Sequence, residues 1–337
     1  MQTTSLCFVC YFKFVVCPFF LKPTHSRFTF GLINTSNTMK RTAIITIVFS
    51  LFLTFSNAQT INKLVKYGDN KDMLLGKINK SGLQSHSFAK WFNKNHDDYI
   101  VNTALVKTFK KDLEHYTIKV FLGTWCGDSK KEVPRFYKVL ETANFPMQQL
   151  EVIALDQSDE AYKQSPNGEE KGLNIHKVPT FIFYKNGEEV NRIVEHPKET
   201  FERDILKIIT TSSYRSNYQA ATYLYSFLEN NSLDSLKSVE LDFIPKMARY
   251  TKGSRDLNSF GYVYLRSNQI EKALYVLDLN AKLYPHDNNV FDSLAEAYFI
   301  NENDNEALKN YYKVLSLKPN DENALKMVAQ INSKTIN

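Results

Sequence analysis

The order of hydrophobic and polar positions predicts a sheet-containing region in the middle of the chain. Between residues 99 and 210, short apolar runs with the length of buried strands alternate with amphipathic helical patterns. The predicted strands are 118–122, 150–155, 181–184 and 189–194. The predicted helices are 99–115, 127–143 and 198–209, with a further helix and loop over 157–172. Because strands alternate with helices, this order predicts an α/β sheet with helices on both faces.

From residue 211 onward the pattern is helical. Helices are predicted over 214–228 and 233–250, the second interrupted at Pro245. Four residues recur after 34 positions, namely Gly261, Tyr264, Ala273 and Pro285 as Ala295, Tyr298, Ala307 and Pro319. This period and pattern resemble tetratricopeptide repeats, placed at 254–287 and 288–321, with a capping helix at 322–333 completing the region 254–337. Residues 211–253 are then a helical linker or a degenerate repeat.

The candidate chemistry centres on Cys126, at the end of the predicted strand 118–122 and the start of a helix. A Cys at a helix N-terminus faces unpaired backbone N–H groups and the positive end of the helix dipole, which favour the thiolate. The other cysteines are Cys7, Cys10 and Cys17. The region from residue 59 onward therefore has one thiol and cannot form an internal disulfide. Such a Cys is either reactive or buried and inert.

Residues 99–210 resemble the thioredoxin family. The resemblance rests on these motifs: Trp125-Cys126-Gly127, Lys130, Pro134, the segment 175–180 and the hairpin 183–188. It implies a thioredoxin fold, a catalytic Cys126 and a cis peptide bond between Val178 and Pro179. The Val178 backbone would then lie beside the Cys126 sulfur, ready to pair with an extended substrate peptide. The residues implied to frame the site are Trp125, Gly127, Asp128, Ser129, Val178 and Pro179.

Two departures from the family pattern define the chemistry to expect. The second Cys of the family is replaced by Ser129, and its buried acid by Val120. In the family the second Cys resolves the mixed disulfide that the first Cys forms, and the acid moves protons to and from that second thiol. Cys126 can therefore attack a disulfide, but release requires an outside thiol. Three behaviours follow: removal of small thiols such as glutathione from proteins, disulfide reshuffling, or covalent retention of a partner.

Neighbouring side chains leave the reactivity of Cys126 open. The Ser129 hydroxyl can donate to a thiolate, whereas the Asp128 carboxylate disfavours one. Three basic side chains favour the thiolate if they turn toward the site: Lys130, Lys131 and Arg135. The predicted function is thiol–disulfide exchange through a single Cys, acting on protein thiols or disulfides with a low-molecular-weight thiol as a further candidate partner. The alternative is a non-catalytic adaptor whose repeats bind a protein or peptide.

Residues 39–58 have the pattern of a secretory signal peptide. A basic start at Met39 precedes an apolar core of 14 residues and small residues ending at Ala58. We expect cleavage near Ala58 and a periplasmic or extracellular location. The apolar core of this segment is shorter than the roughly 20 residues that a membrane span needs. We expect no stable membrane span in the mature chain. Residues 1–38 are interpreted as an over-extended N-terminus; the alternative is a membrane-anchoring extension.

Charge and histidine placement argue against other function classes. Five of the 42 basic residues and none of the 36 acidic ones precede residue 59, so the remaining chain is nearly neutral and no nucleic-acid binding is expected. The histidines after residue 59 lack metal-ligand spacing, and neither metal nor cofactor is expected. His176 alone is placed to lie near Cys126. Residues 59–98 are polar and mixed, and we expect an extension that packs on the next domain through a short helix over 87–93.

Overall fold

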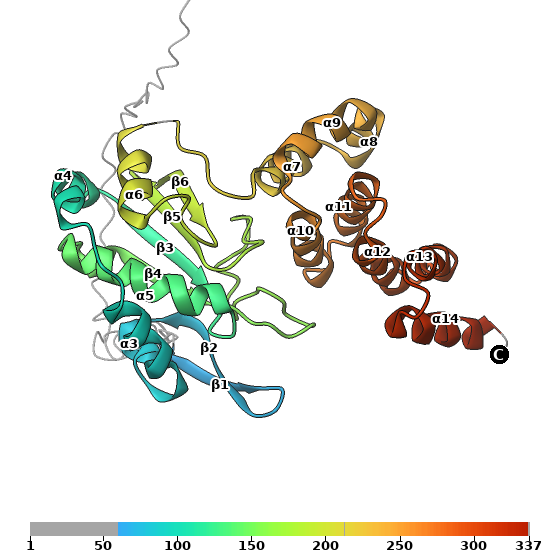
Figure 1. Ribbon diagram of the computed structural model, residues 1–337, viewed down its shortest axis with the longest axis horizontal. Helices are drawn as coiled ribbons and strands as arrows, with labels where there is room; N and C mark the ends of the chain where they lie inside the picture. Colours follow the sequence, from blue (N-terminus) through green and yellow to red (C-terminus); the bar gives the residue numbers. More distant parts are fainter. Residues whose placement is uncertain (1–59, 212, 336–337) are drawn as a thin grey trace, which may run out of the picture. The chain divides into compact units, whose positions relative to one another are not determined.

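A computed structural model describes residues 60–211 and 213–335 (Figure 1). The proposed over-extended N-terminus at 1–38 and the predicted signal peptide at 39–58 lie outside the described residues. Within the described part, a mixed sheet with its helices is followed by a region built entirely of helices. Among these residues no helix combines the length and the apolar character that crossing a membrane would require.

Six strands form one sheet in the order β1-β2-β4-β3-β5-β6. Their bounds are β1 (Lys63–Tyr67), β2 (Lys71–Ile78), β3 (Thr117–Leu122), β4 (Leu150–Ala154), β5 (Thr180–Lys185) and β6 (Glu188–Val194). β3 runs parallel to β4, and every other neighbouring pair is antiparallel. β3 lies between β4 and β5, which explains its mostly apolar sequence, because a central strand is largely buried on both faces. Lys119 is the exception within it and pairs with Glu151.

The first two strands were not predicted from the sequence. β1 and β2 form a hairpin, and β2 pairs with β4 through the register Ile78 to Val152. The segment 59–98 therefore extends the sheet instead of only packing on it. Lysines and Asp72 interrupt the apolar alternation of β2, which lowers its apparent strand propensity. The hairpin leads into α2 (Lys80–Leu83), the 3-10 turn η1 (His86–Phe88) and α3 (Ala89–Asp97).

Helices cover one face of the sheet with a single core. They are α3 together with α4 (Thr103–Leu113), α5 (Gly127–Thr142) and α6 (Phe201–Thr210). Their buried side chains join Ile118, Val120 and Leu122 of β3 in one hydrophobic cluster. Alternate residues of a strand point to opposite faces, so Phe121 of β3 belongs to a different cluster.

The second face of the sheet is packed against coil, so the prediction of helices on both faces is wrong. Phe121 and Ile153 pack with Ile175 and Val178 there. The helix predicted within 157–172 is wrong, because only turns and bends occur between β4 and β5. Pro166 lacks the amide hydrogen that a helix interior needs, and Gly168 and Gly172 have φ angles of 72° and 74°.

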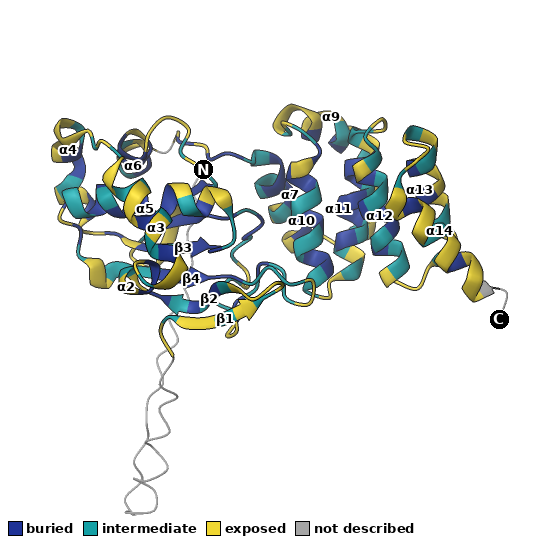
Figure 2. Cartoon of the chain, turned by 60° about the horizontal axis from the view of Figure 1, so that its bottom comes forward, coloured by how far each residue is buried: buried dark blue, intermediate teal, exposed yellow. Residues whose placement is uncertain are grey.

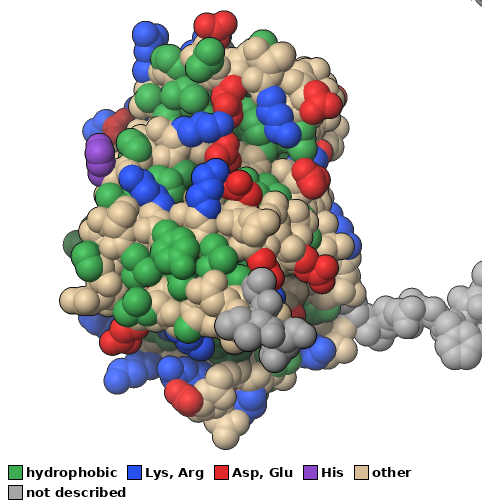
Figure 3. Space-filling view, turned by 90° about the vertical axis from the view of Figure 1, so that its right-hand side faces the viewer, with side chains coloured by type: hydrophobic (Ala, Val, Ile, Leu, Met, Phe, Trp, Pro, Cys, Tyr) green, Lys and Arg blue, Asp and Glu red, His purple; other side chains and the backbone are tan. Residues whose placement is uncertain are grey.

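Eight helices follow in the described C-terminal part of the chain. They are α7 (Gln219–Asn230), α8 (Leu233–Ser238), α9 (Glu240–Tyr250), α10 (Arg255–Arg266), α11 (Ile270–Leu283), α12 (Asn288–Ile300), α13 (Asp304–Leu317) and α14 (Glu322–Thr335). Their buried faces turn toward neighbouring helices (Figure 2). The surface that carries the C-terminal helices mixes apolar with charged side chains (Figure 3).

The helix pairs follow the 34-residue spacing of the sequence. α10 and α11 lie within 254–287, and α12 and α13 lie within 288–321. Gly261 permits the close approach of α10 and α11, because a Cβ there would lie 2.6 Å from Leu277 Cδ2. The assignment of these pairs as tetratricopeptide repeats stays a prediction.

The interruption expected at Pro245 occurs six residues earlier. α8 ends and α9 begins at Val239, whose φ and ψ are −108° and 10°, while Pro245 lies inside α9. Pro245 removes the hydrogen bond to the carbonyl group of Leu241. Leu241 is 88% exposed, so water can satisfy that carbonyl group and the helix continues.

Candidate functional site around Cys126

Cys126 is the N-cap residue of α5, directly after the turn that follows β3. Its backbone is extended, with φ −79° and ψ 131°, and its carbonyl oxygen accepts a hydrogen bond from Lys130 N at 3.0 Å. The thiol is partly exposed and free, and it donates to the carbonyl oxygen of Val178 with an Sγ–O distance of 3.2 Å. The Val178–Pro179 peptide bond is cis. The structure therefore brings together the two segments that the family resemblance implied.

Trp125, next to Cys126 in the chain, is held by a hydrogen bond to the backbone. Its indole Nε1 donates to the carbonyl oxygen of Leu155 at 2.9 Å, just beyond the end of β4. Gly123 leaves room for the indole, because a Cβ at that position would lie 2.4 Å from Trp125 Cε2. The ring of Tyr162 lies 6.4 Å from that of Trp125, measured between centroids. The glycine before Trp125 is thus a requirement of the site geometry.

Ser129 has a different role from the one considered in the sequence. The residue is fully buried, and its Oγ accepts a hydrogen bond from Gly123 N at 3.2 Å. No hydrogen bond joins it to Cys126 in the described structure. Ser129 therefore ties the first turn of α5 to the end of β3. Asp128 is in the same turn, and its charge raises the pKa of Glu195, for which burial is the larger cause.

The basic residues of α5 do not gather on the sulfur. Lys131 and Arg135 both approach Glu132 Oε1, at 3.2 and 3.5 Å. Lys130 lines a hollow beside Trp125. The positive charge that α5 directs at Cys126 is therefore the positive end of its helix dipole, not a basic side chain.

His176 does not lie beside Cys126. It is fully buried, and its ring is edge-on to those of Tyr218 and Phe260, with centroids 6.0 and 5.8 Å away. Its Nε2 is 3.9 Å from Asp256 Oδ1 on α10. Burial lowers the pKa of His176 to about 3, so its ring is neutral at physiological pH. The contacts of the His176 ring are thus with Tyr218 and α10, and none with Cys126 is found among the described residues.

Lys163 was not identified as a site residue from the sequence. This lysine is only 4% exposed, and its Nζ donates to the carbonyl oxygen of His176 at 2.6 Å. Nζ also lies 4.4 Å from the centroid of the Tyr162 ring. Burial and, as a smaller cause, the charge of Lys177 lower the pKa of Lys163 to about 7. A lysine in a polar, irregular segment is ordinarily a surface residue, so only the tertiary structure identifies it.

The site has no metal ligands around it. Within 60–211 and 213–335, no group of three or more His, Cys, Asp and Glu side chains could hold a metal ion. The polar groups described at and near the site are therefore the Cys126 thiol, the carbonyl group of Val178 and the buried amine of Lys163.

Known proteins resemble the sheet-containing part of the chain. Residues 100–207 match the family model for thioredoxin. A stretch of 91 residues, 26% of this chain, is 28% identical to "Thioredoxin Asp f 29" of Aspergillus fumigatus and covers 76% of that protein. The predicted fold class is thereby confirmed: a thioredoxin domain with a mixed sheet is followed by an all-helical region. The family match ends at residue 207, before that region begins.

Proposed function

We propose that this protein carries out thiol–disulfide exchange through Cys126 and that an external thiol completes each cycle. The observation that carries this proposal is the placement of the Cys126 thiol at the N-terminus of α5, 3.2 Å from the carbonyl oxygen of Val178. The position of a resolving Cys holds Ser129, which is buried and bonded to the backbone. A hydroxyl group cannot resolve a mixed disulfide.

The proposed reaction has two steps, and both conserve disulfide bonds. In the first step the Cys126 thiolate attacks one sulfur of a substrate disulfide, and the other substrate sulfur leaves as a thiolate. In the second step an external thiolate attacks the substrate sulfur bonded to Cys126. The new disulfide joins the external thiol to the substrate, and Cys126 leaves as a thiolate. One disulfide is consumed and one is formed in each step, so no further oxidant or reductant enters.

Ionisation of Cys126 also changes what Val178 can bind. In the thiol form, Sγ–H donates to the carbonyl oxygen of Val178. A thiolate has no hydrogen to donate, so ionisation frees this carbonyl group to accept an N–H from an extended substrate chain. Activation of the nucleophile and preparation of a peptide-binding group thus occur together.

The proposal is tested by following how the mixed disulfide on Cys126 forms and how it is released. The full chain is incubated with a peptide disulfide, and the adduct is mapped to Cys126 by peptide mass spectrometry. We expect a stable adduct without added thiol, and its discharge when glutathione is added. Cys126→Ser is the control that forms no adduct at this position. A folded protein that forms no adduct would refute the exchange function and favour the adaptor alternative.

We also propose that the protein is exported. The proposal is supported by the basic, apolar and small-residue segments of 39–58. N-terminal sequencing of the protein from its native cells should give Gln59 as the first residue. A native chain that retains residues 39–58 would contradict export by this route.

A further inference from the structure

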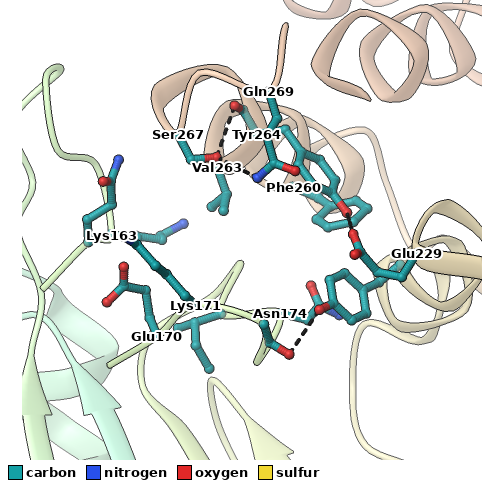
Figure 4. A pocket seen from close by; sticks show the side chains of 14 residues that line it. Lys163, Glu170, Lys171, Asn174, Glu229, Phe260, Val263, Tyr264, Ser267 and Gln269 are labelled. Carbon is teal, nitrogen blue, oxygen red and sulfur yellow. Dashed lines mark hydrogen bonds between the residues drawn. The ribbon is translucent and has the colours of Figure 1, made fainter. Parts of the chain in front are cut away.

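A cavity of about 350 Å³ lies between the coil that connects β4 to β5 and two helices of the C-terminal region, α7 and α10 (Figure 4). We propose that this cavity binds a small carboxylate with an apolar body and that the ammonium group of Lys163 is the partner of the anion. Cys126 is not among the residues that line the cavity. The inference therefore goes beyond the proposed exchange reaction and does not depend on it.

Apolar and aromatic side chains form much of the wall of the cavity. They come from the coil and from both helices, and they are Ile175, Tyr225, Phe260, Val263 and Tyr264. A cavity of a few hundred Å³ with largely apolar walls and a few polar groups is typical of sites for small organic molecules. Such sites often lie where two structural regions meet, as this one does. The wall therefore suits the apolar body of the ligand.

The carboxylates of the lining already have partners. Glu229 accepts hydrogen bonds from Lys272 Nζ at 2.7 Å and from the Tyr264 hydroxyl at 3.3 Å. Glu170 Oε2 accepts a hydrogen bond from Ser165 N at 2.9 Å and a second one from the Ser165 hydroxyl. These two negative charges are thus held by groups other than the lysines of the lining.

The two lysines of the lining have no counter-ion. None of the ion pairs found within 60–211 and 213–335 includes Lys163 or Lys171. Lys163 is only 4% exposed, and its Nζ donates to the carbonyl oxygen of His176 at 2.6 Å. An ammonium group has three N–H bonds, so others remain for a ligand. A buried cation without a counter-ion is unfavourable, and a bound carboxylate would compensate its charge.

Asn174 provides a second polar group with an unfilled hydrogen-bond position. It lines the same cavity, and its Oδ1 is buried without a hydrogen-bond partner in the described part of the chain. The oxygen and the NH₂ group of a side-chain amide can exchange places by rotation, so Asn174 can present an N–H to an anion. The polar groups of the coil are therefore incompletely satisfied on the side of the cavity.

The test compares an acid with its uncharged amide. Binding of 4-phenylbutanoate and of 4-phenylbutanamide to the full chain is measured by isothermal titration calorimetry at pH 6.0. Burial lowers the pKa of Lys163 to about 7, so its amine is mostly protonated at this pH. We expect the wild type to bind the carboxylate at least tenfold more tightly than the amide, because a hydrogen bond to a charged group is stronger than one between neutral groups. Equal binding of the two compounds, or binding of neither, would overturn the proposal.

Variants then locate the charge and the cavity. In Lys163→Met the preference for the carboxylate should disappear, whereas Lys171→Met is the matched control and should keep it within about threefold, because its exposed charge is screened by solvent. Val263→Trp, with an unchanged circular dichroism spectrum, should bind neither compound, because the larger side chain fills the cavity. The proposal is overturned by a folded Lys163→Met protein that keeps the preference, by loss of the preference in Lys171→Met alone, or by undiminished binding to Val263→Trp. Adduct formation at Cys126 is measured separately, so the failure of either proposal leaves the other standing.

Discussion

Replacing the buried Lys163 should stabilise the fold at neutral pH. In Lys163→Met, a side chain of similar length without charge fills the space below the Tyr162 ring. The pKa of Lys163 falls from the ordinary 10.5 to about 7 on burial, and at about 1.4 kcal/mol per pH unit this corresponds to a cost of about 5 kcal/mol below pH 7. The variant also loses the hydrogen bond to His176 and leaves a buried carbonyl group unpaired, which costs about 1–3 kcal/mol.

The net prediction for Lys163→Met is a gain of about 2 kcal/mol in the free energy of unfolding at pH 7. The sign depends on pH. A lysine with a depressed folded pKa contributes stability above its unfolded pKa of 10.5 and loses it as the pH falls toward 7. The advantage of the variant should therefore shrink as the pH rises from 7 to 10.

Urea unfolding of the full chain, followed by circular dichroism at pH 7 and pH 10, measures this difference. Lys171→Met is the control and should change neither value by more than about 0.5 kcal/mol, because its side chain is exposed. A variant at Lys163 that is less stable than the wild type at pH 7, or whose effect is the same at both pH values, would refute the reasoning.

Three further substitutions test other parts of the structure. Gly123→Ala should displace the Trp125 indole, because the new Cβ would lie 2.4 Å from it, and a shifted Trp fluorescence spectrum with unchanged helix content would show this. Gly261→Ala should lower Tm by several degrees in calorimetry, because overpacking against Leu277 costs about 1–3 kcal/mol; an unchanged Tm would contradict the close approach. Burial raises the pKa of Asp256 to about 7 from 3.8, so the wild type loses stability as the pH rises between these values. Asp256→Asn should therefore raise Tm more at pH 8 than at pH 5, and an equal change at both would count against a buried carboxylate.

The central strands and the edge strand β6 could be predicted from the sequence, whereas β1 and β2 could not. Four of the six residues of β3 are buried, on both faces of the sheet, so its mostly apolar sequence indicates a central strand. β1 and β2 form an edge hairpin whose exposed lysines conceal the alternation. The segment 157–172 was expected to contain a helix and a loop, but it forms turns and bends. In the connection from β4 to β5, buried apolar contacts with the sheet come from Ile175 and Val178, beyond that segment.

In the site, too, features that depend on local motifs could be predicted, and features that depend on tertiary packing could not. Cys126 and Val178 could be paired because both belong to local motifs of a known family, and the structure places them 3.2 Å apart. The bond between Ser129 and Gly123 and the burial of Lys163 depend on how separate segments pack. Neither has a local sequence pattern. A polar residue reveals a buried role only once its surroundings are known.

The measurement that tests the central claim most directly is the discharge of the Cys126 adduct at increasing concentrations of external thiol. It is made in a background in which Cys7, Cys10 and Cys17 are Ser, so that no other thiol of the chain contributes. The discharge rate should be proportional to the thiol concentration and fall to zero without thiol. Ser129→Cys in the same background should discharge without any external thiol. Discharge of the Ser129 protein at a finite rate in the absence of thiol would contradict the claim that another molecule completes the reaction.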